Sequence, residues 1–160
     1  MTTSTTISDL TTTATTEVTT TTPEKINVRL PQDLVPTQYE LEIRPYVGPV
    51  EVYGDKAFTF DGKIAMTMNC VKATSKIVFH GLDLNITVSG LELYRTVDKV
   101  AVPFSSVLKY DLEREYYTMT VNEELKAGVE YTLVVPYKAG ILNRLDGFYR
   151  QQYVENGKTF

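Results

Sequence analysis

From Ile26 onward, apolar and polar residues alternate at every second position, and this period constrains the fold more than any other feature of the chain. Tyr39, Leu41 and Ile43, for example, alternate with charged residues, and the same period returns in later segments. Period two is the spacing of a β-strand with one apolar and one polar face, whereas an amphipathic helix repeats at about 3.6 residues. The pattern predicts an all-β fold, an antiparallel sandwich or a saddle-like sheet.

The expected strands are separated by turn residues. A long strand covers Phe58–Asn69, and Gly62 within it predicts a bend or bulge because glycine offers no side chain to pack. Pro136 suggests a sheet edge, since proline cannot donate to a ladder. Residues Asn122–Gly128 predict a short helical turn, with an N-cap residue, acidic residues and a terminal glycine. Further strands are expected at 39–43, 76–80, 86–88, 91–93, 107–110, 116–121 and 131–137.

The beginning of the chain has a different composition. The first 22 residues contain 13 Thr and few apolar residues. Such a segment cannot bury enough apolar surface to offset the entropy lost on ordering. We therefore expect a disordered Thr-rich leader at residues 1–25, and an O-glycosylated stalk is an equally open interpretation. Residues 26–160 are then expected to form one β-sheet domain of ordinary size.

Composition excludes several classes of function. The single cysteine, Cys70, excludes an internal disulfide, and the single histidine, His80, excludes a paired-His metal site. The net charge is −4, with no cluster of Lys and Arg to contact nucleic acid. The sequence contains no run of about 18 apolar residues, which a membrane-spanning helix would need. It also shows no recognisable secretory signal. The residues alone therefore predict no catalytic, cofactor or metal site within the chain.

A few residues still need an interpretation. Asn85-Ile86-Thr87 fits the N-glycosylation pattern, which has meaning only if the chain enters the secretory pathway. His80 follows an apolar strand and is expected to bond to the backbone rather than to bind a metal. Cys70 is expected to be an inert core thiol. The remaining candidates, interpreted as solvated turn charges, are Asp111, Glu113, Glu115, Glu123 and Glu124.

Five segments, in order, resemble the N-terminal domain of aminopeptidase N-like zinc metallopeptidases. Residues Leu30–Pro45 resemble the opening L-P-x-x-L-x-P-x-x-Y-x-L-x-L-x-P, and Phe60–Ile64 resembles F-x-G-x-[VI]. Thr74–Leu84 is similar to T-x-x-I-x-x-H-x-x-[DN]-L, and Leu125–Leu133 is similar to L-x-x-G-x-x-Y-x-L. Leu145–Tyr153 is similar to L-x-G-[FL]-Y-R-S-x-Y. The resemblance covers residues 26–160 and agrees with the β-sheet prediction.

This resemblance implies a function for a longer parent protein. Members of the family remove N-terminal residues from peptides with a zinc ion held by H-E-x-x-H and a later Glu, and a G-A-M-E-N segment binds the substrate amine. None of these motifs is present in the sequence, so zinc and the peptide substrates are expected at a separate catalytic domain, the partner of this one. The chain alone is expected to be inactive, and His80 is taken as structural.

The resemblance also gives the leader a meaning, because many members carry a membrane anchor and a Ser/Thr-rich stalk before this domain. It thus implies a cell-surface or extracellular location and a fragment that is incomplete at both ends. The alternative is a stand-alone extracellular β-sandwich binding module, or a degenerate paralogue that kept only this domain.

Overall fold

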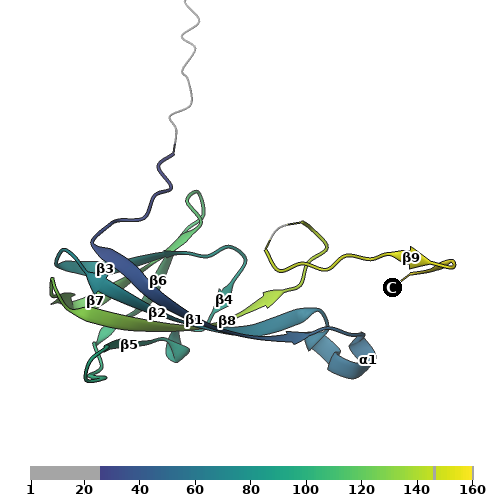
Figure 1. The fold of residues 1–160 in the computed structure, drawn as a ribbon, viewed down its shortest axis with the longest axis horizontal. Helices are drawn as coiled ribbons and strands as arrows, with labels where there is room; N and C mark the ends of the chain where they lie inside the picture. The colour runs from purple at the N-terminus through teal and green to yellow at the C-terminus, as the bar shows by residue number, and fades with distance from the viewer. Residues whose placement is uncertain (1–25, 146, 160) are drawn as a thin grey trace, which may run out of the picture.

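The computed structural model describes residues 26–145 and 147–159, in which two antiparallel sheets pack face to face (Figure 1). The predicted all-β fold is confirmed. Helical structure includes single turns such as α1 (Val50–Tyr53) and the 3-10 turn η1 (Gly54–Lys56), which join the first two strands. The leader predicted at residues 1–25 lies outside the described residues.

The larger sheet is built on three long strands in the order β1 (Leu34–Tyr46), β2 (Thr59–Cys70) and β8 (Glu130–Gly140). Two short strands, β4 (Asn85–Ile86) and β5 (Glu92–Arg95), pair with the other side of β8. β1 and β2 are antiparallel along their length, with one β-bulge near the start of β1. β1 is therefore an outer strand of this sheet.

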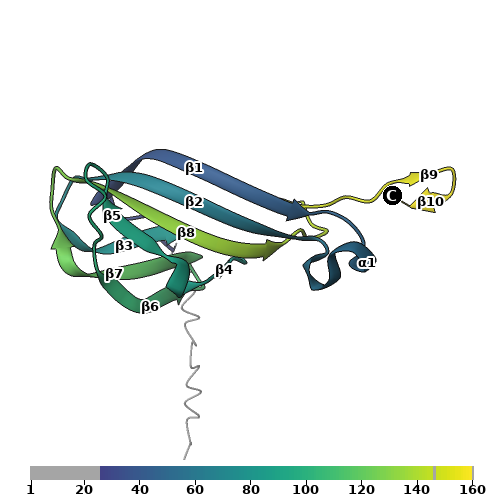
Figure 2. The same cartoon turned by 90° about the horizontal axis from the view of Figure 1, so that it is seen from below.

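The smaller sheet has the order β3 (Thr74–His80), β7 (Tyr116–Leu125) and β6 (Phe104–Asp111). All of its neighbouring strands are antiparallel. A separate hairpin of β9 (Val154–Glu155) and β10 (Lys158–Thr159) lies beyond the end of the larger sheet (Figure 2). The core must therefore form between the larger and the smaller sheet.

Alternate residues of both sheets fill this core, as the period-two pattern predicts. Met119 of β7 and Leu133 of β8 each have 0% of their surface exposed. Cys70 is part of the same cluster, which confirms its interpretation as a core residue. The other buried members are Met66, Met68, Ile77, Phe79, Leu91, Leu93, Val121, Leu125, Tyr131 and Val135.

The larger sheet is longer than the smaller one and continues past it as an extension (Figure 2). We call this extension the sheet arm and define it as residues 41–46 of β1, 59–64 of β2 and 136–140 of β8, which are paired with one another. The turns α1 and η1 lie at its tip. The arm therefore has backbone pairing like the rest of the larger sheet. Its inner face, the side that continues the core-facing side of the sheet, is not covered by the smaller sheet.

Gly62 does not produce the bulge that the sequence predicts. The register of β2 is continuous through Gly62, with Ile43 opposite on β1 and Tyr137 opposite on β8. A Cβ atom added to Gly62 would lie 2.4 Å from Cζ of Tyr137. The glycine thus leaves room for an aromatic ring that lies across β2.

The sheet edge predicted from Pro136 is also wrong, because β8 is an interior strand. β4 ends opposite Tyr137 of β8 and β5 begins opposite Val134, so Pro136 lies where neither strand pairs. The 3-10 turn η2 (Val88–Gly90) packs there, and a Cβ on Gly90 would lie 2.7 Å from Cγ of Pro136. The missing N–H therefore costs no ladder bond on that side, and the strand predicted at 86–88 ends in this turn.

The helical turn predicted at Asn122–Gly128 is absent. Its first half continues β7 to Leu125, and the chain then reverses through Gly128, whose φ is 79°. Leu125 is buried and lies opposite Thr74 of β3. Burial of this side chain in the core outweighs the local helix signal, which was weak because the segment is about one turn long.

Candidate functional site

The residues singled out from the sequence do not come together in one site. Asn85 lies in β4, where it pairs with Lys138, and its side chain and that of Thr87 are exposed. An exposed Asn and Thr satisfy the access that glycosylation requires, although modification itself remains a prediction.

His80 bonds to the backbone, as expected. Its Nε2 lies 3.1 Å from the carbonyl oxygen of Val28, so an N–H at this position donates to that carbonyl. The His80 ring also meets the edge of Tyr116, with centroids 6.0 Å apart. These contacts attach the segment before β1 to β3, which is a structural role.

Cys70 is unsuited to nucleophilic chemistry. Its thiol donates to the carbonyl of Lys72, with Sγ and oxygen 3.2 Å apart. Burial raises the pKa of Cys70, and the nearby carboxylates of Asp33 and Glu124 act in the same direction. The neutral thiol is therefore favoured, and a neutral thiol is neither a good nucleophile nor a metal ligand.

The charged turn between β6 and β7 is held by its own ion pair. Oδ2 of Asp111 lies 3.0 Å from Nη1 of Arg114, and the backbone N–H of Arg114 donates to Oδ1 at the same distance. This backbone bond is the main reason that the pKa of Asp111 is lowered. Glu113 lies 3.6 Å from the same guanidinium group, so the carboxylates are engaged within the turn.

The described residues offer no fitting site for zinc. A zinc site needs three or four closely placed ligands chosen from His, Cys, Asp and Glu, and within residues 26–145 and 147–159 no group of three such side chains could hold a metal ion. The ring of His80 already bonds to a carbonyl, and the thiol of Cys70 is held neutral in the core.

The unusual feature is instead the inner face of the sheet arm. Leu41 and Ile43 lie in the same row of β1 as the core-facing residues, opposite Ile64 and Gly62. Yet 59% of Leu41 and 40% of Ile43 are exposed. An apolar row of this kind is a candidate surface for contact with another part of a protein.

A cleft of about 720 Å³ continues from the arm between β1 and β3. Its walls are predominantly apolar, and Asp33, Lys76 and His80 lie among its polar lining residues. The volume is within the range of about 300–1,000 Å³ found for ligand pockets. The apolar part of the lining includes Leu34, Pro36, Tyr39, Met66, Met68 and Phe79.

The tip of the arm is fixed by a polar cluster around Tyr46. Its hydroxyl donates to Oδ2 of Asp61 at 2.6 Å and accepts from Nζ of Lys56 at 3.2 Å. The bond from Tyr46 is the main cause that lowers the pKa of Asp61, and its bond with Lys56 is the main cause that raises the pKa of Lys56. The loop that carries α1 and η1 is therefore tied back to the sheet.

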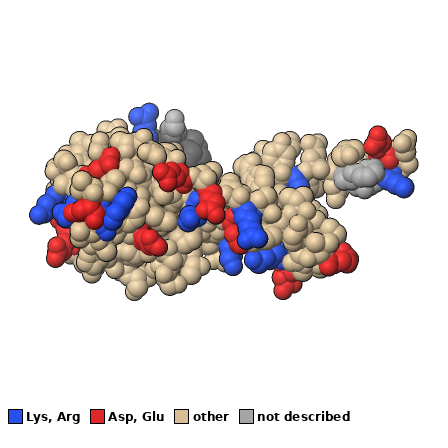
Figure 3. Space-filling view, turned by 60° about the horizontal axis from the view of Figure 1, so that its bottom comes forward, with Lys and Arg blue, Asp and Glu red and all other residues tan. Residues whose placement is uncertain are grey.

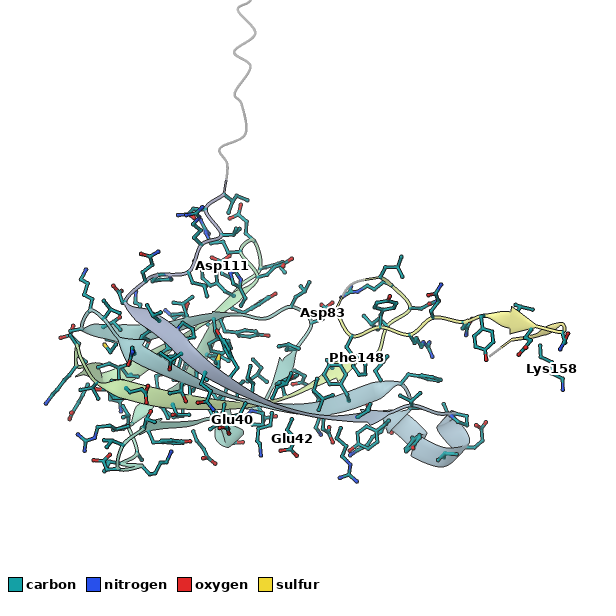
Figure 4. All side chains as sticks on the ribbon, viewed as in Figure 1. Glu40, Glu42, Asp83, Asp111, Phe148 and Lys158 are labelled. Carbon is teal, nitrogen blue, oxygen red and sulfur yellow. The ribbon has the colours of Figure 1, made fainter. Side chains whose placement is uncertain are left out.

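An aromatic contact fixes the other side of the arm. Phe148 meets the edge of Phe60 with centroids 5.3 Å apart, and Phe60 meets Tyr137 in the same way at 6.1 Å. Phe148 projects toward the end of β8 (Figure 4). The segment after β8 is thus held against the part of this face that β2 and β8 form, while Leu41 and Ile43 of β1 stay exposed.

The outer surface shows no block of a single charge. Lys and Arg alternate with Asp and Glu over the sandwich and along the arm on the face shown (Figure 3). Glu40 and Glu42 lie on one side of β1 (Figure 4), and Oε2 of Glu42 lies 2.9 Å from Nζ of Lys63. Within the described part of the chain, no helix has the length and apolar composition of a membrane span.

Sequence reasoning missed the exposed arm. The alternation of Tyr39, Leu41 and Ile43 correctly predicted a strand with one apolar face, but a period cannot show whether a second layer covers that face. The remaining sequence signal was strand length, because the alternating pattern at Phe58–Asn69 is longer than the pattern at 76–80.

Comparison with known proteins gives a consistent result. The family model described as the peptidase M1 N-terminal domain matches residues 35–160. Aminopeptidase N of dog (Canis lupus familiaris) is 30% identical over 131 residues, which are 81% of this chain and 13% of that protein. Human aminopeptidase N is 29% identical over 79% of this chain, and chicken aminopeptidase Ey is 29% identical over 82%. The chain spans 13% of the length of each of these relatives.

Proposed function

The chain belongs to the peptidase M1 N-terminal domain family, and from this premise we propose that it is the non-catalytic N-terminal β domain of a zinc aminopeptidase. Such an enzyme removes N-terminal residues from peptides. The observation that carries the proposal is the family match, which spans nearly all of β1 and every later strand of both sheets. The described residues supply a folded β scaffold rather than a zinc site.

The sheet arm supports a contact role within the longer protein. Its exposed apolar row, Leu41 and Ile43, would be covered by the catalytic domain, and the adjoining cleft would be closed at the same time. Burial of apolar area stabilises such a contact by about 25 cal/mol for each Å² removed from water. In this arrangement the domain flanks the catalytic domain and helps to wall off its cleft.

The division of labour follows from the donor groups. A zinc ion would supply a Lewis acid that activates water, and its ligands would come from the catalytic domain. The single histidine of the sequence bonds to Val28, so the residues of this chain would position and shield the catalytic domain without touching the reacting atoms.

Sequencing the transcript in both directions tests the proposal directly. We expect the reading frame to continue beyond Phe160 into G-A-M-E-N and H-E-x-x-H segments. The purified 160-residue chain should release no N-terminal residue from model peptides when zinc is supplied. A stop codon directly after Phe160 would overturn the proposal in favour of a stand-alone binding module, and peptidase activity of the short chain would overturn the assignment of catalysis to another domain.

The contact role has a separate test in the longer protein. Substitution Ile43→Asp places a charge in the apolar row, and Val97→Asp places the same charge at a residue that is 86% exposed in a loop. We expect the first variant to lower the melting temperature of the whole enzyme and the second to leave it unchanged. Equal melting temperatures would show that the arm is not an interface.

A surface location is proposed with glycosylation at Asn85. The resemblance to aminopeptidase N-like enzymes, many of which carry a membrane anchor, supports a surface location, and the exposed position of Asn85 supports access by the glycosylation machinery. Secretory expression should give a band that peptide N-glycosidase shifts, and Asn85→Gln and Thr87→Ala should each abolish the shift. A shift that persists in Asn85→Gln would exclude this residue as the site.

A further inference from the structure

Arg150 is held against the tip of the sheet arm by its backbone and by its side chain. Its N–H donates to the carbonyl of Leu142, with nitrogen and oxygen 3.0 Å apart. Cζ of its guanidinium group lies 4.0 Å from the centre of the Phe58 ring. The ring face attracts a cation, and the flat guanidinium group of arginine stacks on it more readily than the ammonium group of lysine. The Phe58 ring therefore fixes the guanidinium group of Arg150 in place.

The backbone conformation of Phe58 is unusual for an aromatic residue. Its φ is 55°, in the left-handed region that bulky residues avoid because of steric clashes. Its N–H donates to the carbonyl of Tyr46 at 2.8 Å, and its carbonyl accepts from the N–H of Ile141 at 2.7 Å. Strained residues persist where the surrounding structure holds them, and they are frequent at ligand clamps. At this position the strained conformation places an aromatic ring against Arg150.

The guanidinium group of Arg150 has no acceptor among residues 26–145 and 147–159. Its Nε is buried without a hydrogen-bond partner, and no carboxylate of these residues forms a salt bridge with it. A buried charged donor without an acceptor costs free energy and calls for an explanation. The two terminal amino groups are not among the buried unpaired atoms. The half-buried side chain thus presents these two groups to solvent.

A carboxylate is the group that fits this arrangement. Its two oxygen atoms match two N–H groups of a guanidinium fork, and such a bidentate pair is stronger than a bond between neutral groups. Stacking on Phe58 already restricts the Arg150 side chain, so binding would cost less side-chain entropy than it would for a free arginine. Aspartate and glutamate are the anionic side chains that a docking protein domain offers.

Arg150 also lies close to the surface that the catalytic domain is proposed to cover. Two residues earlier, Phe148 contacts Phe60 on the inner face of the arm (Figure 4). The same face carries the exposed row of Leu41 and Ile43. Interfaces commonly combine an apolar centre with a few anchoring residues, among which arginine is enriched.

On the basis of the function proposed above, we propose that Arg150, stacked on Phe58, is a preformed receptor for a carboxylate supplied by an acidic side chain of the catalytic domain. The apolar row contributes buried area to the contact, and the ion pair fixes how the two domains are oriented. In the isolated chain this receptor has no acceptor, which accounts for the unpaired Nε.

The purified 160-residue chain tests the receptor with acetate as the probe. The Nε–H of Arg150 is followed by ¹⁵N NMR, and the exposed Arg29 is the control in the same sample. At constant ionic strength, acetate should shift the Arg150 signal with half-saturation at about 0.1 M or below. Acetamide, which has a similar shape but no charge, should not shift it. Equal shifts at both arginines, or equal shifts with acetate and acetamide, would overturn the proposal.

Variants of Arg150 separate carboxylate binding from a purely structural role. In the longer protein, Arg150→Met and Arg150→Lys should both lower the melting temperature, because neither side chain offers a guanidinium fork. In the 160-residue chain, Arg150→Met removes both the stacking contact and an unpaired buried donor. These two effects oppose each other, so the melting temperature of the short chain should change little. The matched control Arg29→Met should change neither protein.

The outcomes distinguish this proposal from the proposed function. Equal losses of melting temperature in the short and the long protein would show that Arg150 only packs the arm tip, and the carboxylate partner would be excluded while the proposed function stands. A stop codon directly after Phe160 would overturn the proposed function and, with it, the catalytic domain as the source of the carboxylate.

Discussion

The sandwich and the sheet arm are two parts of the same larger sheet, built by the same strands with the same alternation. In the sandwich, Leu133 has 0% of its surface exposed because the smaller sheet covers it. In the arm, Leu41 lies in a core-facing row of β1, yet 59% of it is exposed. Backbone pairing and side-chain burial are therefore separate properties. Equivalent substitutions in the two parts should change the free energy of unfolding by different amounts.

The largest effect is expected from Leu133→Ala in the sandwich. Removal of a fully buried leucine side chain leaves a cavity between the sheets, and such substitutions lower the free energy of unfolding by about 2–5 kcal/mol. Urea unfolding followed by circular dichroism measures the change. A loss below about 1 kcal/mol would mean that the core collapses around the missing atoms and that the sandwich is packed no better than the arm.

A smaller effect is expected from Gly62→Ala in the arm. The new Cβ would lie 2.4 Å from Cζ of Tyr137, so the ring must move and its edge contact with Phe60 is disturbed. We expect a loss of about 1–2 kcal/mol. The control is the same substitution in a Tyr137→Ala background, where the ring is absent and the added cost should disappear. If the cost persists there, backbone conformation rather than ring contact requires the glycine.

The sequence predicted the long strands because each has several residues of clear alternation. It did not predict that Pro136 lies in an interior strand. This position is possible because Pro136 falls between the end of β4 and the start of β5. It assigned Asn122–Gly128 to a helical turn because local capping signals gave no information about the burial of Leu125 against β3. Local patterns therefore determine which segments are strands, and contacts distant in sequence determine where strands end.

The candidate site was less predictable than the fold. His80 and Cys70 were interpreted correctly because a strand-end histidine and an in-phase cysteine have common structural roles. The exposed apolar row of the arm could not be predicted, since the same alternation occurs in covered and uncovered strands. The exposure of this row depends on where the smaller sheet stops.

Tyr46→Phe tests the polar cluster at the arm tip. Loss of the bond to Asp61 should lower the free energy of unfolding by about 1 kcal/mol at neutral pH, since the carboxylate is partly solvated. The pKa of Asp61 is lowered in the folded state. Its contribution is therefore present above the ordinary carboxyl pKa of about 4 and is lost as the pH falls through the lower folded value.

The difference between Tyr46→Phe and the unmodified chain should thus shrink below about pH 4. Urea unfolding at a series of pH values measures this convergence. Asp61→Asn is the matched control, because it keeps the shape of the side chain and removes its titration. Curves that stay parallel down to the most acidic pH would show that the bond from Tyr46 does not depend on the charge of Asp61.

The smallest effect is expected from Ile43→Thr, which keeps β-branching and removes apolar surface in the arm. Because 40% of Ile43 is exposed and the arm extends past the smaller sheet, the loss should be about 0.5 kcal/mol or less in dilute solution. Urea unfolding followed by circular dichroism measures the change. A small cost would agree with a row that solvent reaches within one chain. A cost equal to that of Leu133→Ala in dilute solution would show instead that the arm is already covered within one chain, and the distinction between the two halves of the sheet would fail.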